Sequence, residues 1–114
     1  MYHTNRPTSF DVLAECAHGY IGVCPGCHEF NFAYNNVAMT FQEEDMVRFC
    51  EWLTGNRFNP EHQYCSVQGR NIAFRSPLDN MFLIFKLEEL EEINQMLQEA
   101  QLVLEARRLA SIYE

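Results

Sequence analysis

The stretch from Ile21 to Phe41, IGVCPGCHEFNFAYNNVAMTF, constrains the fold more than any other part of the chain. It contains a tight Cys-Pro-Gly-Cys turn, followed by two apolar-rich runs, Glu29–Tyr34 and Val37–Phe41, with Asn35 and Asn36 between them. The first run alternates aromatic and smaller residues, as a half-buried β-strand does. Two residues that tolerate positive φ between such runs are typical of a hairpin turn, so we expect both asparagines to adopt positive φ. The stretch therefore predicts a thiol-bearing turn that leads into a β-hairpin.

Two helices are predicted, one in each half of the chain. The first covers Gln42–Thr54, where Thr40 and Glu43 have the spacing of a capping box and acidic residues fill the first turn. Residues 56–69 are then expected to form a long connection. The second helix runs from Leu87 to Tyr113, with glutamates at its start and arginines near its end, as the helix dipole favours. We expect these glutamates to form a solvated face of the helix.

The two halves of the chain resemble each other. Residues 36–46 align without a gap on residues 80–90, although unrelated strand-to-helix junctions would show a similar pattern. Each half has the order strand–turn–strand–helix, over about residues 20–55 and about residues 70–113. We therefore predict an α+β fold in which two ββα units form one antiparallel sheet, with both helices on one face and a long C-terminal helix. Residues 1–114 suit a single domain.

Three features carry a resemblance to a known family. They are a glycine–aliphatic pair before a CxxC turn, an aromatic-Asn-Asn hairpin, and a second hairpin with a proline in its turn. In this chain they are Gly22-Val23 before Cys24 and Cys27, then Tyr34-Asn35-Asn36, then Ile72–Phe85. Over about residues 20–97 the chain resembles a family of short uncharacterised proteins, typical of Bacteroidota, that is described as a domain of unknown function. The resemblance implies the fold above and no particular reaction.

The overall composition restricts the classes of partner and the location. The formal net charge of −8 makes the surface acidic, which disfavours binding to the phosphate backbone of nucleic acids. No apolar run approaches the roughly 18 residues of a membrane-spanning helix, and the N-terminus lacks the pattern of a secretory signal. We therefore expect a cytoplasmic protein that binds neither nucleic acids nor membranes. An odd number of cysteines, five, argues against a framework of disulfides.

The turn formed by Cys24 and Cys27 is the strongest candidate for a functional site. Tight CPxC turns between strands present two thiolates to zinc in ribbons and knuckles. Structural zinc takes four ligands, and Cys16 and His18 are the nearest candidates in the sequence. We therefore predict a structural zinc ion at Cys24, Cys27, Cys16 and His18. The sequence also offers three alternative ligands: His28, His62 and Cys65.

Three other interpretations of this turn stay open. CPGC resembles the C-P-x-C of thiol–disulfide oxidoreductases, although a strand-like pattern follows in place of the helix that lowers the thiol pKa. CPGCH resembles a c-type haem attachment motif, which needs export. The two thiols could also be unliganded, as we expect for Cys50 in the core. Because no phosphate loop, nucleophile elbow or HExxH pair is present, we expect a small binding or regulatory module rather than an enzyme.

The predicted last helix is long for a domain of this size. It would span about 40 Å, whereas the domain should be only about 30 Å across. Apolar residues continue to its end, including Leu104, Leu109 and Ile112, and the first helix is too short to cover them. We therefore predict a symmetric homodimer through the C-terminal helix. The alternative is a helix end that frays or bends back after Ala100.

Overall fold

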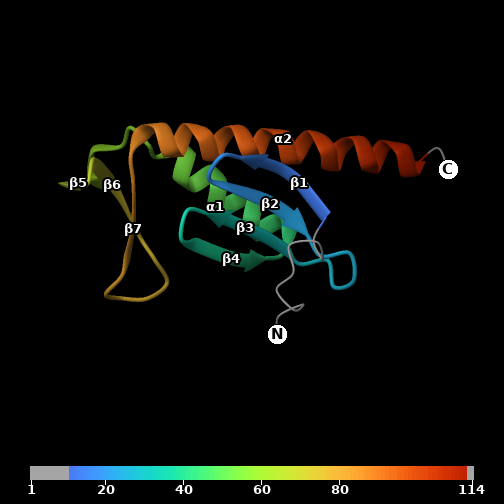
Figure 1. The fold of residues 1–114 in the computed structure, drawn as a ribbon, viewed down its shortest axis with the longest axis horizontal. Coiled ribbons are helices and arrows are strands. Elements are labelled where there is room, and N and C mark those ends of the chain that lie inside the picture. The colour runs from blue at the N-terminus through green and yellow to red at the C-terminus, as the bar shows by residue number, and fades with distance from the viewer. Residues whose placement is uncertain (1–10, 113–114) are drawn as a thin grey trace.

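The computed structural model describes residues 11–112, which form an α+β structure with a long C-terminal helix, as predicted (Figure 1). In chain order the elements are β1 (Asp11–Cys16), β2 (Gly19–Val23), β3 (Phe30–Tyr34), β4 (Val37–Phe41), α1 (Glu43–Gly55), the 3-10 helix η2 (Pro60–His62), β5 (Gln63–Val67), β6 (Arg70–Arg75), β7 (Phe82–Phe85) and α2 (Leu87–Ile112). No helix within these residues is both long and apolar enough to cross a membrane. The single-domain assignment and the duplication of a ββα unit stay predictions.

The strands form two antiparallel sheets, so the predicted single sheet is wrong. One sheet has the order β1-β2-β3-β4 and the other has the order β5-β6-β7. The first half gains β1 and β2 beside its hairpin, and the second half gains β5 from residues 56–69, which were expected to be a connection. Each hairpin thus forms a sheet with strands from its own half of the chain. Among the strands of the described residues, β4 and β7 are both edge strands.

The central hairpin lies where the sequence predicts it. Tyr34 pairs with Val37, which leaves a two-residue turn at Asn35 and Asn36. Only Asn35 adopts positive φ, at 53°, so the prediction for Asn36 is wrong. The predicted capping box is also wrong, because the N-cap of α1 is Gln42, whose side chain makes no capping hydrogen bond.

Both helices contact the four-stranded sheet. Helix α2 lies against β1 and β2, α1 lies against β3 and β4, and the two helices contact each other, so they cover the same face (Figure 1). Phe32, Met46, Leu53 and Ile93 are among the residues that are fully buried between these layers. Cys50 is buried there as well, as predicted.

The end of α2 is better covered than the sequence suggests. Arg107 binds Asp11 at the start of β1, and Arg108 lies 3.7 Å from Glu43 at the start of α1. Leu104 packs partly buried against the core. Of the three apolar residues that were expected to lie uncovered, Leu104 is thus partly covered, whereas Leu109 and Ile112 are exposed. The large apolar residues that remain exposed on α2 beyond residue 100 are Leu102, Leu109 and Ile112.

Candidate functional site

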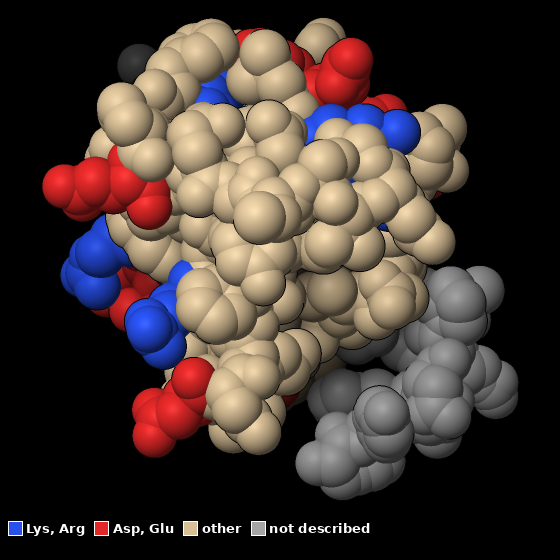
Figure 2. All heavy atoms as spheres, turned by 90° about the vertical axis from the view of Figure 1, so that its left-hand side faces the viewer, with Lys and Arg blue, Asp and Glu red and all other residues tan. Residues whose placement is uncertain are grey.

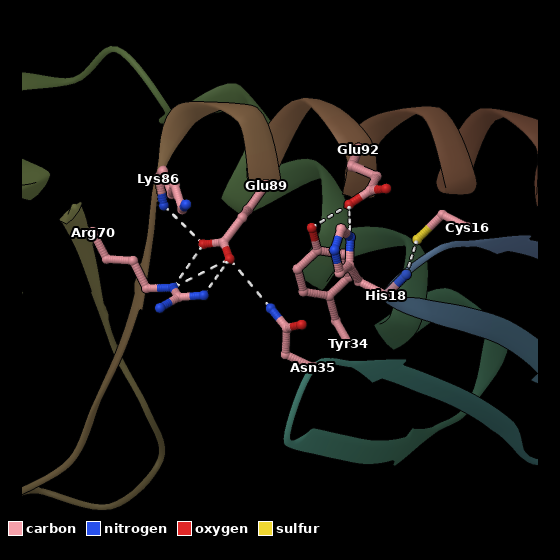
Figure 3. Close-up of polar contacts among 8 residues, drawn as sticks. All are labelled: Cys16, His18, Tyr34, Asn35, Arg70, Lys86, Glu89 and Glu92. Carbon is pink, nitrogen blue, oxygen red and sulfur yellow. Dashed lines mark hydrogen bonds and ion pairs between the residues drawn. The ribbon is translucent and has the colours of Figure 1, made fainter. Parts of the chain in front are cut away.

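A cluster of three potential metal ligands joins the β1–β2 hairpin to the second turn of α2 (Figure 3). Cys16 ends β1, His18 lies in the two-residue turn that follows, and Glu92 reaches them from α2. One ligand atom from each side chain lies within 4.8 Å of the others. Within residues 11–112 this is the one such group of three or more histidine, cysteine and acidic side chains.

The local backbone explains how the hairpin presents the first two residues. Cys16 pairs with Gly19, and the backbone N–H of His18 donates a hydrogen bond to the Cys16 sulfur over 3.4 Å. Gly19 lies so close to β3 that a Cβ atom there would be 1.9 Å from the carbonyl oxygen of Ala33. Only glycine fits at this position, so close packing of β2 on β3 holds the hairpin end in place.

Glu92 is the centre of the polar contacts in the cluster. One oxygen, Oε1, lies 2.8 Å from Nδ1 of His18 and accepts a hydrogen bond of 2.5 Å from the hydroxyl of Tyr34 (Figure 3). The hydrogen bond from Tyr34 lowers the pKa of Glu92, which outweighs the opposite effect of burial. Burial raises the pKa of Tyr34, and the hydrogen bond to Glu92 and then the negative charge of Glu92 add to the rise. The carboxylate therefore stays charged beside a neutral phenol.

The surroundings of Cys16 raise its pKa, whereas those of a reactive cysteine lower it. Burial raises its pKa, and the charge of Glu92 adds to the rise, while the backbone N–H groups of His18 and Gly19 oppose it. The ordinary state of this thiol at neutral pH is therefore protonated, and it becomes a strong ligand only when a cation displaces its proton.

A second carboxylate of α2, that of Glu89, binds residues from both sheets. Arg70 on β6 donates to both of its oxygens, with the shortest contact at 2.7 Å, and Asn35 donates from the β3–β4 turn over 3.2 Å. The backbone N–H of Lys86 also donates to it over 2.9 Å. Burial raises the pKa of Glu89, but the hydrogen bonds from Arg70 and Lys86 outweigh this effect and lower it.

The prediction that the glutamates of the last helix form a solvated face is thus wrong for two of them. Glu89 is 8% exposed, and Glu92 binds Tyr34 and His18. Their spacing of three residues places both on the helix face that meets the hairpins. This spacing could have indicated that Glu89 and Glu92 share one face of the helix. It was hard to recognise, because Glu88 and Glu91 belong to the same run of glutamates.

The four predicted zinc ligands lie at two separate places. Cys16 and His18 lie at one end of β2, and Cys24 and Cys27 lie at the other, after a strand of five residues. Such a strand is roughly 16 Å long, which is far more than the span of one metal site. The alternative ligands are also dispersed. Cys65 is exposed on β5, His28 is exposed beside Cys27, and the His62 ring packs 4.5 Å from Phe74.

The CPGC turn has a regular geometry of its own. The N–H of Cys24 donates to the carbonyl of Glu29 over 2.8 Å, and the N–H of His28 donates back to the carbonyl of Cys24 over 2.9 Å. His28 has a φ of 60°, which closes the turn. Hydrogen bonds from the Cys27 thiol, and then from the backbone N–H groups of Cys27 and Gly26, lower the pKa of Cys24. The same contact between the thiols raises the pKa of Cys27.

Comparison with known proteins gives one match. The model of a family of unknown function, DUF6686, matches residues 7–111, which confirms the predicted resemblance to an uncharacterised family. The match does not test a Bacteroidota origin. No curated protein and no solved structure matches the chain. Because the family model covers nearly the whole chain, the protein belongs to the family of unknown function DUF6686.

Proposed function

We propose that this protein is a small zinc-binding module in which Cys16, His18 and Glu92 hold the ion. The single observation that carries the proposal is the convergence of these three side chains, from the β1–β2 hairpin and α2, within 4.8 Å. A thiolate, an imidazole and a carboxylate are all established zinc ligands. Donor atoms around a tetrahedral zinc ion lie roughly 3.5 Å apart, so the cluster needs to contract only slightly to bind it.

The proposed role of the ion is structural. His18 and Glu92 are 74 residues apart in the sequence, and an ion bound to both would fix the hairpin end to α2. Binding free energy at such a site adds to folding free energy, because the unfolded chain does not hold the ligands together. A hollow of ≈ 320 Å³, lined in part by His18, Tyr34 and Glu92, leaves room for a fourth ligand from solvent.

The CPGC turn is a second candidate for the ion, and one observation favours it. The Cys24 sulfur accepts hydrogen bonds from backbone N–H groups, as thiolates do at the turns of zinc knuckles. The alternative role in thiol–disulfide exchange has less support. In that reaction a solvent-accessible thiolate attacks a sulfur atom of a disulfide. Here the thiol with the lowered pKa is that of Cys24, which is only 3% exposed.

Metal analysis of variants tests the proposal. Protein purified without chelator should contain about one zinc ion per chain, and His18→Ala and Glu92→Gln should each lose it and melt at a lower temperature. Cys24→Ser should keep its zinc. The reverse pattern, with zinc lost from Cys24→Ser and kept in His18→Ala, would assign the ion to the CPGC turn. Wild-type protein without zinc after incubation with excess Zn²⁺ and desalting would refute both assignments. The cytoplasmic location stays a prediction.

A further inference from the structure

An apolar groove of ≈ 620 Å³ separates the two sheets, between β4 and the β6–β7 hairpin. Val37, Met39 and Phe41 of β4 form one wall, Met81 lies on the other, and Phe49 and Trp52 of α1 line it between them. The volume falls within the range of about 300–1,000 Å³ that is usual for ligand sites. Trp52 is 40% exposed and Met81 is 44% exposed, so the groove is open to an incoming molecule.

The strand that borders this groove lacks the usual protection of a sheet edge. β4 pairs with β3 in unbroken register from Val37 to Phe41, and within residues 11–112 it pairs with no other strand. Natural edge strands usually carry a lysine, a proline or a bulge that prevents further pairing. The β4 sequence, VAMTF, contains no charge and no proline, and its ladder has no bulge. The outer backbone groups of β4 are therefore available to another strand.

The groove also carries a positive charge, that of Arg75. Among the lining residues that the structure describes, Arg75 is the one charged residue, in a chain with a formal net charge of −8. Its guanidinium donates to the carbonyl of Asp79 over 3.4 Å and lies 5.1 Å from the centre of the Phe82 ring. Within residues 11–112 no carboxylate lies within ion-pair distance of Arg75. An acidic group is the complementary partner for it.

The end of the molecule formed by β5, β6 and β7 is weakly charged. Figure 2 views the molecule from the end where β5, β6 and β7 lie, and uncharged side chains cover the middle of this face, with charged ones toward its edge. Leu78 and Phe82 are exposed in the β6–β7 hairpin, and Tyr64 stacks on Phe82 from β5. Large apolar groups of this kind gather at protein interaction sites.

We propose that the groove binds an extended peptide segment of a partner protein, which pairs with β4 as a fifth strand. In this arrangement backbone hydrogen bonds to β4 provide affinity, and alternate apolar side chains of the peptide contact Phe49 and Trp52. A carboxylate of the peptide pairs with Arg75. The added strand fills the space between the two sheets, so the peptide joins them. A second copy that pairs through its own β4 is a poorer occupant, because its sequence VAMTF offers no carboxylate to Arg75.

Selection from a phage-displayed library of random linear peptides tests the proposal. The selected sequences should alternate apolar and other residues and should contain an aspartate or glutamate at a fixed position. A fluorescent copy of the most enriched peptide should bind Trp52→Ala at least roughly tenfold more weakly, since aromatic side chains at the centre of interfaces dominate affinity. Phe58→Ala is the matched control, because Phe58 is an exposed aromatic residue outside the groove, and it should bind as the wild type does.

Two further measurements keep the test independent of the folding of Trp52→Ala. The Arg75→Glu variant should bind the acidic peptide more weakly than the wild type does. It should bind more tightly a version of that peptide in which lysine replaces the acidic residue. Hydrogen exchange should slow at the amides of residues 37–41 when the peptide binds. The proposal is overturned if no peptide is enriched, if Arg75→Glu binds the acidic peptide as tightly as the wild type, or if protection appears elsewhere and not on β4. It is also overturned if light scattering and crosslinking show a second copy seated on β4.

Discussion

Replacing Glu89 with glutamine should weaken the attachment of α2 to both sheets. The substitution keeps the size of the side chain and removes its negative charge. Glu89 is 8% exposed and binds Arg70 through both of its oxygens, as well as Asn35 and the N–H of Lys86. Hydrogen bonds to charged groups contribute about 1.5–3 kcal/mol. Since glutamine retains a carbonyl that can accept from Lys86, we expect a net loss of about 2–3 kcal/mol.

Urea denaturation followed by circular dichroism measures this difference. For a chain of 114 residues the loss corresponds to a decrease in melting temperature of about 10 °C. Glu88→Gln is the matched control, because Glu88 is the exposed neighbour, and its effect should stay within about 0.5 kcal/mol. Equal stability of Glu89→Gln and Glu88→Gln would refute the role assigned to the buried carboxylate.

The pH dependence provides a second check on the same variant. The pKa of Glu89 in the folded protein lies below its ordinary value of about 4.3, so its charge stabilises the fold above that pH. The stability is lost as pH falls through the folded pKa, because the protonated carboxyl resembles glutamine. The difference between wild type and Glu89→Gln should therefore be full at pH 7 and should shrink below about pH 4. A difference that is constant from pH 7 to pH 3 would contradict this reasoning.

Three further predictions concern the hairpins and the association of chains. Gly19→Ala should cost about 3 kcal/mol or more in urea denaturation, since its Cβ would lie 1.9 Å from the Ala33 carbonyl oxygen; an unchanged midpoint contradicts this. Asn35→Val should lower the free energy of unfolding by about 2 kcal/mol, because valine tolerates the positive φ of this position poorly and cannot donate a hydrogen bond to Glu89. Asn36→Val should lower it by less than half as much. Light scattering should give the mass of a homodimer that Leu109→Glu converts to monomer and Glu99→Gln does not; a single-chain mass at all concentrations rules the dimer out.

The sequence predicts the elements with strong periodicity and misses those without it. The β3–β4 hairpin and α1 were predictable, because aromatic alternation and helical spacing of apolar residues are both clear there. β5 was not, because every residue from Gln63 to Val67 is exposed and no buried face marks it. The division into two sheets was also beyond the sequence, since it depends on which edges pair and not on which residues form strands.

The candidate site shows the same limit. Cys16 and His18 were predictable as candidate ligands from their residue types and their spacing. Their partner was not, because Glu92 is 74 residues from His18 in the chain and lies in a run of glutamates with similar local surroundings. Conversely, we grouped Cys16 and His18 with the CPGC turn because they are close in sequence. A β-strand rises about 3.3 Å per residue, however, so the strand between them holds the two pairs apart. Only the three-dimensional fold assigns the carboxylate to the hairpin.

X-ray absorption at the zinc edge tests the central claim most directly. Protein loaded with one zinc ion per chain would be measured, and the extended fine structure would be fitted for the number of sulfur atoms bound to the metal. A site at Cys16, His18 and Glu92 predicts one sulfur at about 2.3 Å together with nitrogen and oxygen ligands at about 2.0–2.2 Å. Two sulfur ligands would contradict the account and would assign the ion to Cys24 and Cys27.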